Sequence, residues 1–152
     1  MTECPLSDVV VIFDLDGTLV DSAPDLCSAL NHVLKNEGLD DVPLHAVRAA
    51  VGHGARASLK QAYLYLGAKM PDDPRLDDQV ERFVDYYRDH IADESCLFEG
   101  AVSCMNTLEQ SGAKLAVCTN KMEGLAFPVL EALGVVSRFE VILGRDSLAE
   151  HK

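Results

Sequence analysis

The sequence predicts an α/β protein with a parallel sheet and an inserted all-helical domain. Short apolar runs rich in β-branched residues occur at 9–13 and 114–118, and a shorter one occurs at 141–143. Helical patterns precede the second and third runs, and strands that alternate with helices form parallel sheets. Between the first and second runs, residues from about 22 to 94 show helical patterns and no strand pattern.

The first run and the helical block each have a recognisable pattern. The continuous apolar run Val9 to Phe13 is typical of a central parallel strand covered on both faces. The helical block begins near Ser22, where Ser22-x-x-Asp25 is a helix start with Pro24 in the first turn. Its clearest helix carries an apolar stripe from Leu76 to Ile91.

The remaining helices lie in the C-terminal third of the chain. A helix over about 101–111 precedes the second strand, and another over about 122–133 precedes the third. Pro128 lies inside the latter, so we expect it to kink that helix or to shorten its start. The patterns together give an α/β core from residues 1–21 and 95–152, and a helical domain from residues 22–94.

Composition limits the classes of partner. The 152 residues carry a net charge of −12 and are 48% hydrophobic, so the chain can bury a core but has little basic surface for nucleic acid or anionic membranes. No apolar run approaches the ~20 residues of a membrane span. A small anionic substrate fits, because a metal and a few cations can reverse the field in one cleft. An odd number of cysteines without C-x-x-C spacing predicts reduced thiols in a cytoplasmic protein.

Polar residues follow the first two strands directly. Ligands of an open parallel sheet bind beyond the carboxyl ends of its strands, where Asp14 and Asp16 follow the first strand and Thr119 and Asn120 follow the second. Asp14 and Asp16 can point the same way, while Leu15 points into the protein. Two close carboxylates repel unless a cation lies between them or one holds a proton, which suits a divalent metal or a general acid. Alternatively, the pair only begins a turn.

These stretches resemble the motifs of the haloacid dehalogenase superfamily of phosphohydrolases. FDLDGTLVDS resembles the first motif, VCTNK at 117–121 the second, and GRDSLAEHK at 144–152 the approach to the third, which a lysine closes. The resemblance covers essentially the whole chain. With GHGARASL, LFEGA and LEALGV, it is greatest for the phosphoglycolate phosphatase group. It implies a Rossmann-like core and a helical cap.

The resemblance implies a role for each matching residue. Asp14 would be the nucleophile that forms an aspartyl phosphate, and Asp16 would act as general acid and then as general base. The Asp14 carboxylate and the Asp16 backbone carbonyl would bind the cofactor Mg²⁺. Thr119 and the Asn120 backbone would bind phosphate oxygens, and Lys152 would steady the nucleophile and the phosphate. The implied reaction is hydrolysis of a small phosphorylated metabolite.

Two basic residues outside these roles have two interpretations each. Arg56, beside His53 between two cap helices, could bind a carboxylate or second anion of the substrate, or it could be a helix-start arginine. We favour substrate binding for Arg56. Lys121 could neighbour the phosphate, but we expect a solvated lysine in a loop.

The resemblance also implies a fourth motif, in which one or two acidic residues after a later strand complete the Mg²⁺ site. We expect the chain to end before this motif, with three core strands present, and we expect residues 1–152 alone to be inactive. Three alternatives stay open: a phosphosugar mutase of the same superfamily, a receiver-like phosphoacceptor domain and a non-catalytic fragment. A receiver carries its acceptor on a middle strand, whereas the D-x-D here follows the first strand.

Overall fold

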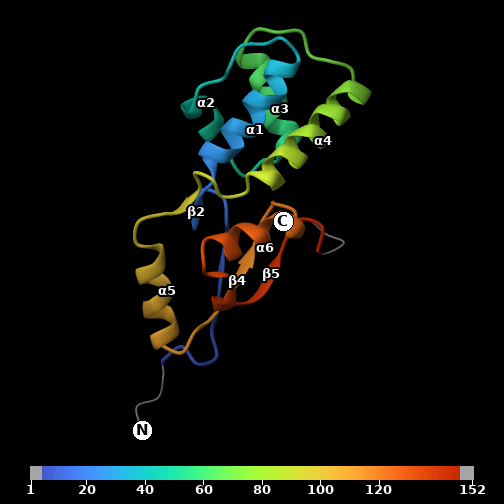
Figure 1. The fold of residues 1–152 in the computed structure, drawn as a ribbon. Coiled ribbons are helices and arrows are strands. Elements are labelled where there is room, and N and C mark those ends of the chain that lie inside the picture. Colours follow the sequence, from blue (N-terminus) through green and yellow to red (C-terminus); the bar gives the residue numbers. More distant parts are fainter. Residues whose placement is uncertain (1–4, 148–152) are drawn as a thin grey trace. The chain divides into compact units, whose positions relative to one another are not determined.

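The computed structural model of the protein describes residues 5–147, and their contacts form two compact units. Unit 1 consists of the chain up to Asp21 and from Cys96 onward, and unit 2 consists of Ser22–Ser95. The elements follow in the order β1 (Val10–Phe13), β2 (Val20–Asp21), α1 (Ala23–Asn36), α2 (Leu44–Arg48), α3 (Ala55–Tyr65), α4 (Asp73–Asp89), β3 (Cys96–Leu97), α5 (Ala101–Gln110), β4 (Lys114–Cys118), α6 (Glu123–Ala132), the short 3₁₀ helix η1 (Val136–Arg138) and β5 (Phe139–Leu143) (Figure 1).

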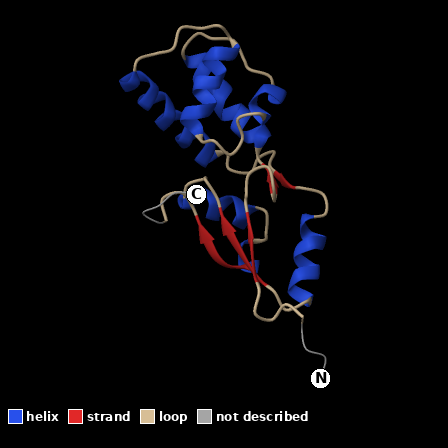
Figure 2. Ribbon diagram, turned by 180° about the vertical axis from the view of Figure 1, so that it is seen from behind, coloured by secondary structure: helices blue, strands red, loops and turns tan. Residues whose placement is uncertain are grey.

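Unit 1 is built on a parallel sheet, which confirms the predicted α/β fold class. The described strands form a three-stranded sheet in the order β1-β4-β5, and Figure 2 shows their arrows side by side and pointing the same way. Helix α5 contacts β4, and α6 contacts β5. Phe13 pairs with Val117, so the carboxyl ends of β1 and β4 lie next to each other.

The two faces of this sheet differ in exposure. Leu115 and Val117 on one face are each 1% exposed. On the other face Ile12, Ala116 and Val141 share one row of the sheet, and the two outer side chains are 64% and 47% exposed. The expectation that the first strand is covered on both faces is therefore wrong for residues 5–147, in which β1 pairs with β4 alone and Ile12 stays open to solvent.

A short antiparallel pair lies where the chain leaves and re-enters unit 1. Strands β2 and β3 pair Val20 with Leu97 and Asp21 with Cys96. The backbone N–H of Phe98 extends the pairing by donating to the Leu19 carbonyl at 3.0 Å. The sequence did not predict these strands, because a strand of two residues is too short to show the alternation on which strand prediction depends.

Unit 2 is helical and closes around its own core. Helix α1 packs against α2 and α4, and α3 packs against α2 and α4. The stripe predicted for the longest helix provides Leu76, Phe83 and Tyr87, which are between 1% and 3% exposed. They pack in a core whose other fully or nearly buried side chains include Leu30, Val33, Leu34, Leu59 and Ala62.

The start of α1 differs from the expectation in one respect. The helix begins at Ala23 as predicted, but Ser22 forms no side-chain capping hydrogen bond. Asp25, which is 2% exposed, instead accepts hydrogen bonds from the backbone N–H of Glu94 at 3.0 Å and from that of Ser95 at 2.8 Å. The Ser95 hydroxyl donates to the same carboxylate at 2.5 Å. Asp25 therefore joins the segment that enters unit 2 to the segment that leaves it.

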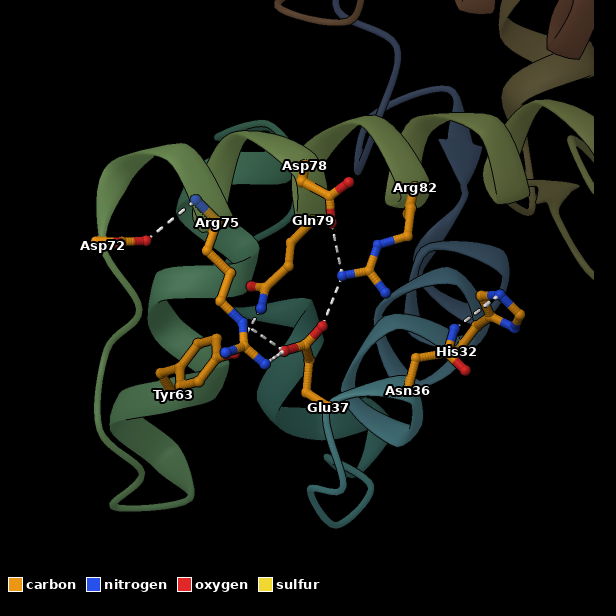
Figure 3. Close-up of polar contacts among 9 residues, drawn as sticks. All are labelled: His32, Asn36, Glu37, Tyr63, Asp72, Arg75, Asp78, Gln79 and Arg82. Atoms are coloured by element: carbon orange, nitrogen blue, oxygen red, sulfur yellow. Dashed lines mark hydrogen bonds and ion pairs between the residues drawn. The ribbon is translucent and has the colours of Figure 1, made fainter.

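Charged side chains link α1 to α4 at the surface of unit 2 (Figure 3). The Glu37 carboxylate, whose side chain is 7% exposed, accepts hydrogen bonds from Arg75 Nε at 2.9 Å and from Arg82 at 2.6 Å. Arg82 also pairs with Asp78 at 2.9 Å. Burial alone would raise the pKa of the Glu37 carboxyl, but the hydrogen bonds from Arg82 and Arg75 outweigh it and hold the pKa below its ordinary value.

Helix α6 (Glu123–Ala132) contains a proline in its interior. Pro128 lies inside α6, which neither begins at it nor ends before it. The predicted shortening at Pro128 therefore does not occur, because the helix already begins at Glu123.

Among the described residues, the helices are too short or too polar to cross a bilayer.

Candidate active site

The D-x-D stretch lies in a tight loop at the carboxyl end of β1. Leu15 is 0% exposed and points into the protein, as the sequence predicts. Its carbonyl accepts backbone hydrogen bonds from Leu19 and Val20, both at 3.0 Å. Gly17 has a φ of 79°, a left-handed conformation that glycine adopts without steric cost. The loop therefore fixes the backbone on both sides of Asp16 directly after the strand.

Strand β4, the neighbour of β1 in the sheet, is followed by the hydroxyl residue Thr119 and by Lys121. Thr119 is 2% exposed, and its backbone N–H donates to the Leu143 carbonyl of β5 at 2.9 Å. Its Oγ1 accepts from the backbone N–H of Lys121 at 3.1 Å. Because β1 and β4 end side by side, this turn, with the exposed Asn120 at its centre, lies beside the D-x-D loop.

A buried ion pair joins the two strand ends. Lys121 Nζ lies 3.3 Å from Asp16 Oδ1, and the two side chains are 5% and 7% exposed. The expectation of a solvated Lys121 is therefore wrong. The sequence does not predict this burial, because Asp16 and Lys121 are distant in the chain and only the fold brings their side chains together.

The loop after β5 approaches Lys121 closely at Gly144. A Cβ at Gly144 would lie 2.2 Å from the Glu123 backbone nitrogen and 2.8 Å from the Lys121 carbonyl oxygen, distances too short for any side chain. The backbone N–H of Arg145 donates to the same Lys121 carbonyl at 3.0 Å. Glycine at this position thus lets the loop hold the backbone of Lys121. A glycine directly after a predicted strand was the one available signal.

Side chains of the same loop hold the start of α6. Asp146 Oδ1 accepts from the backbone N–H of Glu123 at 2.8 Å. The Ser147 hydroxyl accepts from the backbone N–H of Gly144 at 2.8 Å and hydrogen-bonds the Glu123 carboxylate. The described part of the GRDSLAEHK stretch therefore supports the turn that carries Lys121. Lys152 at the end of that stretch lies outside the described residues.

The oxygen donors near Asp14 suit a hard divalent cation. Mg²⁺ binds proteins through one or two carboxylates and keeps several water or phosphate ligands. The Asp14 carboxylate and the Asp16 backbone carbonyl are donors of this kind, and the Leu15 N–H donates to Asp14 Oδ1 at 2.8 Å, which orients the carboxylate. Residues 5–147 contain no cluster of three or more His, Cys, Asp or Glu that could hold a metal. The donor set fits Mg²⁺ as a site with few protein ligands.

Arg56 lies in unit 2, in the first turn of α3. Its guanidinium forms an ion pair with Asp77 and lies 3.7 Å from an Asp73 carboxylate oxygen, both on α4. The side chain is 43% exposed. A substrate carboxylate at Arg56 would have to compete with these two aspartates. Because exposed ion pairs are weak, a ligand can replace the aspartates as the partner of Arg56.

The fold agrees with the family comparison. Residues 11–152 match the family model described as haloacid dehalogenase-like hydrolase. The chain belongs to this family.

Individual relatives cover the chain almost completely. A Caulobacter vibrioides protein named phosphoglycolate phosphatase is 45% identical over 141 residues, which are 93% of this chain and 59% of the relative. A protein of the same name from Agrobacterium fabrum is 43% identical over 152 residues, which are 100% of this chain and 64% of the relative. A crystal structure described as a predicted phosphoglycolate phosphatase from Haemophilus somnus 129PT has a TM-score of 0.85 at 30% identity, covering 97% of this chain and 66% of that one. The chain thus spans about three fifths of the length of the two curated relatives.

Proposed function

We propose that this chain provides the nucleophile and the cap of a Mg²⁺-dependent phosphomonoesterase that acts on phosphoglycolate or a similarly small phosphorylated carboxylate. One observation carries the proposal. Asp14 and Asp16 follow β1 directly, and Asp16 contacts Lys121 from the neighbouring strand end at 3.3 Å. An anionic nucleophile, a second carboxylate, a hydroxyl and an ammonium group at one edge of a sheet suit phosphoryl transfer. The names of the relatives support the substrate class.

The proposed reaction has two steps. A carboxylate oxygen of Asp14 attacks phosphorus, and the bond between phosphorus and the leaving oxygen breaks as Asp16 donates a proton to that oxygen. In the second step, Asp16 takes a proton from a water molecule, which attacks the aspartyl phosphate and releases inorganic phosphate. The Asp14 carboxylate is thereby free of the phosphoryl group again, and Asp16 again carries its proton.

The other residues of the site hold the phosphoryl group. Thr119 and the Asn120 backbone bind its oxygens, and Lys152 steadies the nucleophile and the phosphate. The Asp14 carboxylate and the Asp16 carbonyl would hold Mg²⁺. When bound, Mg²⁺ supplies positive charge that offsets the negative charge of the transferring group.

Unit 2 is proposed as the cap that excludes bulk water and selects the substrate. Arg56 is its proposed contact to the substrate carboxylate, because a guanidinium binds a carboxylate through two parallel hydrogen bonds. In this proposal the substrate replaces Asp73 and Asp77 as the partner of Arg56.

Replacing the nucleophile tests the function. In the full-length protein, Asp14→Asn keeps the shape of the side chain but removes the charge that attacks phosphorus. We expect Mg²⁺-dependent hydrolysis of phosphoglycolate and of an aryl phosphate to fall by several orders of magnitude, with an unchanged melting profile. Asp41→Asn is the control, because Asp41 is exposed and pairs only loosely with Lys35, at 3.4 Å. Near-normal hydrolysis by Asp14→Asn would show that another group attacks phosphorus.

A further inference from the structure

We infer that Lys121 is a positioning residue that holds the Asp16 carboxylate in the orientation required for proton transfer to the leaving oxygen. The inference rests on the proposed function, in which Asp16 is the acid. It starts from the ion pair between Lys121 Nζ and Asp16 Oδ1, which spans 3.3 Å between two side chains that are more than nine-tenths buried.

Burial makes this pair unlike the other ion pairs of the described chain. Removing an ammonium and a carboxylate from water costs several kcal/mol for each ion, and pairing offsets this cost only partly. At the start of β4, Lys114 pairs with Glu140 at 3.2 Å, but both of those side chains are 56% exposed. Buried pairs are poor devices for stability, because apolar side chains of similar volume serve as well. The Lys121–Asp16 pair is therefore better explained by the orientation that it imposes on Asp16.

The backbone around Lys121 is held from two sides, which such a positioning role requires. Thr119 Oγ1 accepts from the Lys121 N–H at 3.1 Å, and the Arg145 N–H donates to the Lys121 carbonyl at 3.0 Å. Gly144 lies so close to the Lys121 carbonyl that even a methyl group there would collide. The Lys121 backbone is fixed at the ends of strands β4 and β5. The position from which its ammonium pairs with Asp16 is therefore defined.

A lysine that orients the general acid has a distinctive kinetic effect. Alkyl phosphates have a poor leaving oxygen that needs a proton in the transition state, whereas an aryl phosphate with an activated phenol needs less. Loss of orientation at Asp16 should therefore reduce kcat for the alkyl substrate most. A lysine that only bound substrate phosphate would instead raise KM for both substrates alike.

The kinetic test compares Lys121→Met with Lys114→Met in the full-length protein. For Lys121→Met we expect kcat on phosphoglycolate to fall about tenfold to hundredfold, and kcat on nitrophenyl phosphate to fall only a few-fold. KM should change little for either substrate. Lys121→Arg should restore part of kcat because it keeps the positive charge, and Lys114→Met should match the wild-type protein.

A combined substitution separates positioning from direct binding. In an Asp16→Asn background the acid is already absent, so adding Lys121→Met should reduce phosphoglycolate hydrolysis no further. The inference would be overturned if Lys121→Met raised KM equally for both substrates and did so also in the Asp16→Asn background. That result would assign Lys121 to phosphate binding.

A stability cycle tests the pair without any catalysis. Thermal unfolding of the 152-residue chain in a chelating buffer is measured for Lys121→Met, for Asp16→Asn and for the double variant. Each single variant removes one partner of a buried ion pair and should lower the Tm, whereas the Tm loss of the double variant should be smaller than the sum of the two single losses. Additive losses would overturn the inference whatever the kinetics. An inactive full-length protein would overturn the proposed function, and with it the role of Lys121, even where the cycle shows coupling.

Discussion

The two units of the molecule differ in where their ion pairs lie. Unit 2 closes a helical core with residues such as Leu76 and Tyr87, each 1% exposed, and places most of its ion pairs at the surface. Unit 1 leaves Ile12 at 64% exposure on one face of its sheet, yet it buries the charges of Asp16 and Lys121 at one end. Unit 2 thus keeps most of its ion pairs exposed, whereas unit 1 buries one ion pair at its strand ends.

A site at the strand ends accounts for this difference, because it depends on polar side chains that are fixed at one edge of the sheet. Parallel strands reach stability by being covered on both faces, so a face with exposed Ile12 and Val141 contributes little burial. The polar network from Thr119 to Ser147 is local and directional, and it serves to fix side chains at one edge. We therefore expect substitutions in unit 2 to act mainly on stability or selectivity, and substitutions at the strand ends to act on every substrate.

The largest expected effect on stability is at Asp25 in unit 2. Its carboxylate accepts hydrogen bonds from three donors, the backbone N–H groups of Glu94 and Ser95 and the Ser95 hydroxyl, at 2.5 to 3.2 Å, and it is 2% exposed. Asp25→Ala leaves these donors without their acceptor, and we expect a loss of about 3 kcal/mol in the free energy of unfolding. Denaturant unfolding combined with peptide-resolved hydrogen exchange measures the loss and locates it.

Asp93 provides the control for Asp25. Asp93 precedes Glu94 in the segment that donates to Asp25, but it is exposed and its described contact is to His90 at 2.7 Å. Asp93→Ala should cost about 0–1 kcal/mol. Faster exchange in α1 and α4 is expected for Asp25→Ala alone. Equal loss of protection in β4 and β5 would contradict the view that unit 2 has its own cooperative core.

A smaller effect, on selectivity, is expected at Arg56. Arg56→Ala in the full-length protein should lower kcat/KM for phosphoglycolate by about tenfold or more, because a charge-assisted contact to the substrate carboxylate is lost. The kcat/KM for an aryl phosphate without a carboxylate should stay nearly unchanged. Lys60→Ala, an exposed residue of the same helix, is the control. An unchanged ratio of the two specificity constants would make Arg56 a structural residue that pairs with Asp73 and Asp77.

The smallest effect is the pH-dependent contribution of Glu37. Its folded pKa is lower than its ordinary value, so its ion pairs stabilise unit 2 at pH values above the unfolded pKa of about 4.3. This contribution is lost as the pH falls through the folded pKa. Glu37→Gln should therefore lower the Tm near neutral pH, and its deficit relative to wild type should shrink on acidification below about pH 4. A deficit that is equal at both pH values, or matched by Glu81→Gln on the exposed face of α4, would contradict this role.

The sequence predicts the local elements well. Apolar runs identify β1, β4 and β5, and the stripe from Leu76 identifies α4, because each pattern is a property of a few consecutive residues. The inward orientation of Leu15 follows from simple alternation along the strand. The D-x-D motif gives the position of the candidate site.

Features that depend on distant segments escape prediction. The close approach of the loop after β5 to the Lys121 backbone requires Gly144, and Ser95, which donates to Asp25, lies 70 positions later in the chain. Strands β2 and β3 exist only because residues at two distant positions pair. The exposure of Ile12 likewise depends on which segments cover the sheet, which a single apolar run does not encode.

The role of Asp14 as nucleophile is tested most directly by locating the phosphoryl group during turnover. The full-length protein is mixed with phosphoglycolate and Mg²⁺, stopped with acid, digested and analysed by mass spectrometry. We expect a phosphoryl group on the peptide that contains Asp14 in the wild-type protein and none on that peptide in the Asp14→Asn variant. A phosphoryl group on a residue of unit 2, or on Asp16 in place of Asp14, would contradict the assignment of the nucleophile to the end of β1.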